Sequence, residues 1–234
     1  MLDIIRGGNF SILNVIIYLI STAAVIFITL PIHEWAHGFA ATRLGDPTPK
    51  WQGRLSFNPL AHLDPIGAIS ILLFGFGWAK PVQINPRYFK NVKTGMAITA
   101  LAGPLANLIM AFVSVLLGCG ILVVFDKTGL LLFYFISLFF AFVANINISL
   151  AVFNLIPIPP LDGSRLLGVI LPDRIYYRIM QYERYLFYIV LLLLATNVLT
   201  IPLSILSGFV KNLYMLIVSV IFPDNLVAFF SRLF

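Results

Sequence analysis

The residues with the clearest chemical potential in this chain are His33, Glu34 and His37, in the order His-Glu-Trp-Ala-His. Residues four apart project from one face of a helix, so the two imidazoles can bind one zinc ion and the glutamate can act as a general base. In a soluble helix the same pattern is often only a solvated face. Two of the three histidines and one of the two glutamates of the chain lie within these five residues, which favours the metal site.

The helix that carries this motif has the length of a membrane span. An apolar stretch covers residues 12–32, and we expect one helix from about residue 11 to residue 44. Roughly 20 residues suffice to cross a bilayer, and ionisable groups in such a helix are usually functional. Pro31 lies two residues before His33. It either kinks the helix and opens its backbone, or it is tolerated as prolines in membrane helices often are.

The composition is that of an integral membrane protein. Of the 234 residues, 60% are hydrophobic and only 10% are charged, whereas soluble domains average about 25% charged residues. The single cysteine, Cys119, excludes a disulfide framework and a thiolate zinc site. The net charge of +6 is spread over loops, which indicates a membrane surface as the partner rather than a nucleic acid.

Apolar runs predict an all-α polytopic membrane protein. The second and third long helices are expected at residues 93–125 and 130–155, and runs at 185–199 and 203–222 give one or two further spans. We treat residues 1–234 as a single membrane domain. Its expected parts are a catalytic core at 11–172, an insert within that core at 45–92, and C-terminal transmembrane helices at 173–234.

The insert between the first two helices is predicted to form a small membrane-associated β-sheet. Residues 50–57 alternate polar and apolar side chains, and residues 77–86 form a second short extended segment. The apolar run 66–76 between them is too short to span and is expected to be re-entrant or interfacial. A free strand edge can bind an extended peptide, or the two strands can simply brace the loop.

A second distinctive stretch, residues 153–165, reads Phe-Asn-Leu-Ile-Pro-Ile-Pro-Pro-Leu-Asp-Gly-Ser-Arg. Its prolines end the third helix, and Asp162 follows them. A carboxylate on irregular backbone beside a membrane helix is expected to line a cavity or meet a cation, unless it only caps a helix that begins at Gly163. His33, His37 and Asp162 together would supply three ligands to one Zn²⁺ per chain, with the fourth position open for water.

Loop charges predict the orientation of the chain. Seven Lys and Arg residues lie in the loop 43–93 and four more follow the third helix, but the turn 126–129 contains only Lys127. The positive-inside rule places the first two loops in the cytoplasm. The histidine pair and Asp162 then share the cytoplasmic ends of their helices, which supports a single site in the cell membrane.

Zinc at this site would generate hydroxide near neutral pH, and Glu34 would take the water proton and return it to a leaving amine. A tetrahedral intermediate needs a donor for its oxyanion, and Asn154 is a candidate, although it can equally bond another helix. Asn107 is expected to bond across helices. His62 is a transient fourth ligand, a lid element or a loop histidine without a metal role.

These residues resemble the site-2 protease family of intramembrane zinc metalloproteases. The resemblance rests on the His33–His37 motif, on Gly-Pro-Leu-Ala-Asn at 103–107, and on the pattern N-x-x-P-x-P-x-L-D-G at 154–163. It implies a three-helix catalytic core with zinc on His33, His37 and Asp162. It also implies Glu34 as the base and Asn154 as an aid to the oxyanion. It also implies that the region 50–90 is a sheet that binds the substrate as a strand.

Members of that family are zinc metalloendopeptidases that cleave membrane-anchored proteins, often regulatory ones, near the cytoplasmic face. The resemblance therefore implies a membrane-anchored protein substrate and the lipid bilayer as partners. No segment resembles a PDZ domain or a nucleotide-sensing domain, so we expect a minimal member that binds no nucleotide.

Three other functions compete with this hypothesis. A metal transporter would have polar ligands at several depths, whereas here they cluster at one end. A prenyl-protein endopeptidase would be expected to bring a later His or Glu ligand, but no histidine follows His62. An inactive scaffold that binds transmembrane segments would not need the complete set of motifs.

Overall fold

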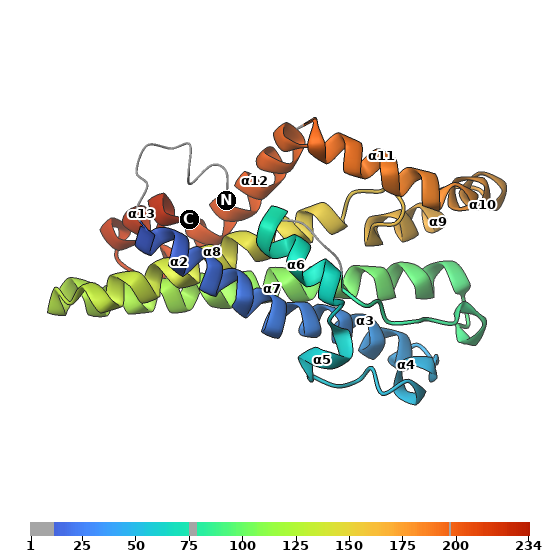
Figure 1. The fold of residues 1–234 in the computed structure, drawn as a ribbon, viewed down its shortest axis with the longest axis horizontal. Coiled ribbons are helices and arrows are strands. Elements are labelled where there is room, and N and C mark those ends of the chain that lie inside the picture. Colours follow the sequence, from blue (N-terminus) through green and yellow to red (C-terminus); the bar gives the residue numbers. More distant parts are fainter. Residues whose placement is uncertain (1–11, 75–78, 197) are drawn as a thin grey trace.

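The first long helix runs from the beginning of the described chain through the histidine motif to Arg43. The computed structural model describes residues 12–74, 79–196 and 198–234. This helix comprises α2 (Ile12–Ala24), the π-helical turn η1 (Val25–Thr29) and α3 (Leu30–Arg43). The predicted start near residue 11 lies outside the described residues. Figure 1 shows this helix alongside α7 (Val92–Thr128) and α8 (Leu131–Asn154).

Among the described residues, four helices are long and apolar enough to cross a membrane. They are Ile12–Arg43, Val92–Thr128, Leu131–Asn154 and Thr200–Val218, the last of which is α12. The chain is thus an all-helical, multi-pass membrane protein. The two predicted inner helices differ from α7 and α8 by at most three residues at either end.

The turn η1 is the local response of the first helix to Pro31. The N–H of Leu30 donates to the carbonyl of Val25, five residues back, instead of the carbonyl four residues back. A proline clashes with the carbonyl four residues before it and cannot donate to it, so a widened turn relieves both problems. The helix therefore continues through Pro31 into the histidine motif.

The core of the molecule lies between α7 and α8, which pack antiparallel. Small buried residues permit their close approach, among them Ala111, Ala141 and Ala144. The hydroxyl of Ser137 donates to the Gly118 carbonyl across the two helices at 3.0 Å. The last helix, α13 (Asp224–Leu233), closes this core with the fully buried ring of Phe230.

The prediction of a β-sheet in the insert is wrong for the described residues, which form no strand. Residues 48–51 form the short helix α4 (Thr48–Trp51) instead. Proline within its first turn fixes a helical φ, and Asp46 Oδ1 accepts a hydrogen bond from the Thr48 N–H at 2.9 Å. The short helix α5 (Pro59–His62) follows.

The second predicted strand, residues 77–86, is also not a strand. Residues 77–78 lie outside the described chain, residues 79–85 pair with no neighbouring strand, and η2 (Pro86–Tyr88) begins at Pro86. The helix α6 (Pro65–Phe74) is as short as its apolar run suggested, and it contacts α2. Its re-entrant position in a bilayer stays a prediction.

The C-terminal part folds back over the core as a broken helix. After η3 (Asp162–Leu166) and α9 (Leu167–Ile170), the amphipathic helix α10 (Asp173–Gln181) leads into α11 (Glu183–Ala195). Only α12 (Thr200–Val218) has the length of a span, and α11 meets it at an angle (Figure 1). The predicted runs 185–199 and 203–222 are therefore one short helix and one spanning helix.

Candidate metal centre

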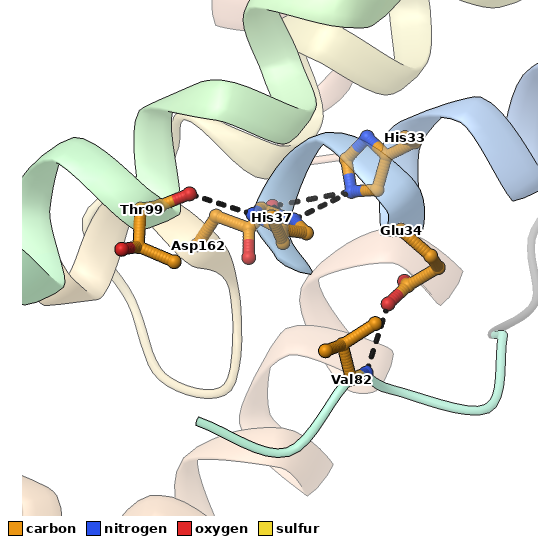
Figure 2. Close-up of polar contacts among 6 residues, drawn as sticks. All are labelled: His33, Glu34, His37, Val82, Thr99 and Asp162. Carbon is orange, nitrogen blue, oxygen red and sulfur yellow. Dashed lines mark hydrogen bonds and ion pairs between the residues drawn. The ribbon is translucent and has the colours of Figure 1, made fainter. Parts of the chain in front are cut away.

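His33 and His37 lie one turn apart on α3 and face Asp162, which comes from η3 more than 120 residues later. The two Nε2 atoms are 3.1 Å apart. Asp162 Oδ2 lies 3.4 Å from Nε2 of His33 and 3.3 Å from Nε2 of His37 (Figure 2). The structure thus brings together the three side chains that the sequence predicted as ligands.

The spacing of these three atoms fits a tetrahedral zinc ion. Bonds of about 2.0–2.1 Å to nitrogen or oxygen place two ligand atoms of a tetrahedron roughly 3.3 Å apart. All three observed separations lie close to that value. Two imidazoles and one carboxylate are also a usual ligand set for a catalytic zinc with one open position.

The main chain of α7 fixes the orientation of the His37 ring on the side away from Asp162 and His33. Its Nδ1 lies 2.7 Å from the carbonyl oxygen of Thr99, so Nδ1 carries the proton and Nε2 is free to bind a metal (Figure 2). The buried Nδ1 of His33 has no such partner among the described residues. The main chain therefore orients the ring of His37 but not that of His33.

Gly103 allows α7 to approach the two imidazoles. A Cβ built at this position would overlap the His37 ring and would lie 2.6 Å from Cε1 of His33. The predicted role of Gly103 in close helix approach is therefore confirmed. Asn107 is buried one turn further along α7, but its Oδ1 has no hydrogen-bond partner, so the predicted bond across helices is not seen at that atom.

Asp162 reaches the histidines because the chain doubles back sharply after α8. It is the first residue of η3, whose N-cap is Leu161, so the capping alternative for its side chain is not what the structure shows. A Cβ at Gly163 would overlap the carbonyl groups of Leu155 and Ile156. Burial opposes ionisation of Asp162, but the charges and hydrogen bonds of His37 and His33 hold the pKa of its carboxyl below the usual range.

Glu34 is buried next to the histidines and faces the loop between α6 and α7. Its exposed fraction is 8%, and its Oε2 accepts a hydrogen bond of 3.0 Å from the main-chain N–H of Val82 (Figure 2). No described protein group donates to Oε1. The carboxylate therefore has one oxygen held by the protein and one free for another partner.

These polar groups share one largely apolar cavity of about 590 Å³. One wall carries His33, Glu34, His37 and Asp162, and Asn154 lines the cavity from the last residue of α8. Helix α11 contributes four apolar side chains to the lining, those of Phe187, Val190, Leu191 and Leu194. The alternative role of Asn154 in bonding another helix is not seen among the described residues.

Other polar residues around the site include one that the sequence analysis considered, His62, and several that it did not. His62 lies in α5, apart from the ligand group, and its ring Nε2 lies 2.8 Å from the Ser56 carbonyl. Arg165 and Glu183 line the cavity and form an ion pair at 3.4 Å, which sequence reasoning missed. It also missed the contacts of Thr99 and Val82, which are made by main-chain atoms and leave no signal in residue type.

The chain is similar to proteins of one peptidase family. A model described as peptidase family M50 matches residues 119–196. The chain is 39% identical over 188 residues to YwhC of Bacillus subtilis, which is named as a candidate zinc metalloprotease, with 79% of this chain and 83% of that protein covered. The chain therefore belongs to peptidase family M50, the site-2 protease family, and is a zinc metalloprotease.

Two further relatives carry names of the same kind. MJ0611 of Methanocaldococcus jannaschii is 37% identical over 162 residues, covering 68% of this chain and 73% of that protein. Rip2 of Mycolicibacterium smegmatis is 30% identical over 176 residues, covering 73% and 65%. No solved structure matches the chain.

Proposed function

We propose that this protein is an intramembrane zinc endopeptidase that hydrolyses peptide bonds in or near transmembrane segments of membrane-anchored regulatory proteins. The observation that carries this proposal is the convergence of His33, His37 and Asp162 within 3.1–3.4 Å of one another, beside a buried glutamate. The two histidines belong to a helix of membrane length. We assign residues 11–172 to the catalytic core and 173–234 to the C-terminal helices.

In this mechanism His33, His37 and Asp162 would hold a zinc ion, which when bound would supply Lewis acidity and a water acidic enough to ionise near neutral pH. Glu34 accepts the proton of the attacking water on its free carboxylate oxygen and delivers it to the leaving amine. The amide of Asn154 donates to the developing oxyanion from the same cavity wall. The buried position of Glu34 strengthens these electrostatic interactions because little water competes for them.

The apolar wall of α11 supports a substrate that arrives from the lipid. Its four apolar side chains line the same cavity as the ligands, and they offer a surface that matches a hydrophobic segment. Hydrolysis requires access to the main-chain carbonyl, so the segment must be unwound where it is cut. The Lys and Arg residues of the loops at this end support the proposal that the reaction occurs at the cytoplasmic face of the cell membrane.

The decisive experiment compares wild type with Glu34→Gln. Both proteins are co-expressed with candidate single-span membrane proteins, and the cut products of the wild-type reaction are sequenced. We expect Glu34→Gln to retain zinc but to cleave no reporter, because an amide cannot accept the water proton. Proteolysis by purified Glu34→Gln would remove Glu34 from the role of base and overturn the proposed mechanism.

A further inference from the structure

The contact between Val82 and Glu34 joins a loop to the base of the proposed reaction. Both residues are 8% exposed, so their hydrogen bond of 3.0 Å is shielded from water. A bond from an N–H to a carboxylate is stronger than a bond between neutral groups, and a low local dielectric strengthens it further. Figure 2 shows the Val82 amide pointing directly at the carboxylate.

The loop that presents this amide is itself fixed on both sides of Val82. The N–H of Lys80 donates to the His62 carbonyl at 2.8 Å, and the N–H of Asn85 donates to Asp46 Oδ2 at 2.7 Å. The side chains of His62 and Asp46 are fully buried. Residues 79–85 are therefore attached at three main-chain amides, and the middle attachment is Glu34.

We propose that Val82 is a positioning residue whose main-chain N–H aims the carboxylate of Glu34. A glutamate side chain has three rotatable bonds, and the amide fixes one oxygen so that the other faces the cavity beside the ligands. The inference rests on the proposed function and adds to it that the main-chain N–H of Val82 helps to set the rate of the chemical step. Sequence reasoning gave this segment only a bracing role or a role in substrate binding.

The kinetic test uses prolines at neighbouring positions, because proline lacks the N–H. Val82→Pro removes the donor to Glu34, whereas Val82→Ala removes the side chain and keeps that donor. Gln83→Pro is the matched control, since the Gln83 N–H makes no hydrogen bond within the described chain. We expect Val82→Pro to lower kcat on a cleavable single-span reporter roughly 10–100-fold with bound zinc unchanged, and Gln83→Pro to keep kcat near wild type. Val82→Ala should lower kcat less than Val82→Pro does, because it keeps the donor to Glu34.

A second test measures the hydrogen bond between Val82 and Glu34 directly and needs neither zinc nor substrate. Hydrogen exchange of the amides in residues 79–85 is measured in Glu34→Ala and Glu34→Gln in lipid nanodiscs. Alanine has no acceptor, so the Val82 amide should exchange at least about 10-fold faster than in wild type. Glutamine retains a carbonyl oxygen and should preserve most of the protection. The amides of Lys80 and Asn85 should stay protected in both variants, because their acceptors are unchanged.

The outcomes separate this inference from the proposed function. Equal exchange of the Val82 amide in wild type and Glu34→Ala would show that the contact does not exist in the membrane. Wild-type kcat in Val82→Pro, with Glu34→Gln inactive, would overturn the positioning role and leave the peptidase assignment intact. A Val82→Pro variant that changes KM alone would also overturn it, because aiming the base affects the transition state rather than binding.

Discussion

Gly103 on α7 lies so close to His37 on α3 that the imidazole occupies the space of any side chain at position 103. Gly103→Ala should therefore push the His pair away from Asp162 and weaken zinc binding roughly 10–100-fold, the range seen when support of a ligand is lost. Zinc titration against a competing chelator measures this change. Gly120→Ala on the same helix is the control, because its Cβ would meet only ring carbons of Phe222 at 3.9 Å. Equal losses in the two variants would indicate general damage to α7.

Asp162→Ala should lower the zinc content of the purified protein, because two histidines alone leave the ion with a single pair of protein ligands. Metal analysis after dialysis against a weak chelator checks this expectation. His62→Ala is the matched comparison and should retain zinc, since His62 lies in α5 and contacts Ser56. Unchanged zinc stoichiometry in Asp162→Ala would remove Asp162 from the ligand set.

Asn154→Ala should reduce kcat roughly 10²–10³-fold while zinc binding persists, which is the usual effect of losing one oxyanion donor. Asn145→Ala tests whether any asparagine on α8 has this effect, since Asn145 lines a different cavity, between α8 and α12. Steady-state cleavage of one reporter by both variants gives the comparison. If Asn154→Ala turns over as fast as Asn145→Ala, the donor must be another group.

Asp46→Ala should loosen residues 79–85 without changing any proposed ligand. The buried carboxylate accepts from the main-chain N–H groups of Thr48 and Asn85, and each unpaired buried donor costs about 1–3 kcal/mol. Hydrogen exchange should show lost protection at Asn85, and activity should fall more than zinc affinity. Protection equal to wild type would show that other contacts hold the segment.

Much of the fold and the ligand set could be predicted because they depend on features that sequence displays directly. Apolar length defined α7 and α8, and the spacing of His33 and His37 defined a shared helix face. The charges of the loops predicted that Asp162 and the histidines lie at the same end. None of these inferences requires knowledge of side-chain packing.

The insert was harder to predict because its sequence fits more than one local structure. Alternation over residues 50–57 suggested a strand, but the prolines around Thr48 begin a helical turn that includes Trp51. A short segment with proline on both sides is governed by its local φ values rather than by side-chain periodicity. Contacts such as that of Val82 depend on main-chain atoms, which every residue except proline provides.

Because of the π-helical turn η1, the direction in which His33 and His37 point depends on the number of residues that precede them in the first helix. Each residue of a helix advances the chain by about 100°, so the extra residue in this turn sets the two halves of the first span out of phase. Deleting one residue within 25–29 would leave a more regular helix but rotate either the histidines or the lipid-facing side chains of α2 to the wrong side. Evolutionary gaps in relatives should therefore avoid this stretch, even though none of its residues lines the cavity that holds the proposed ligands.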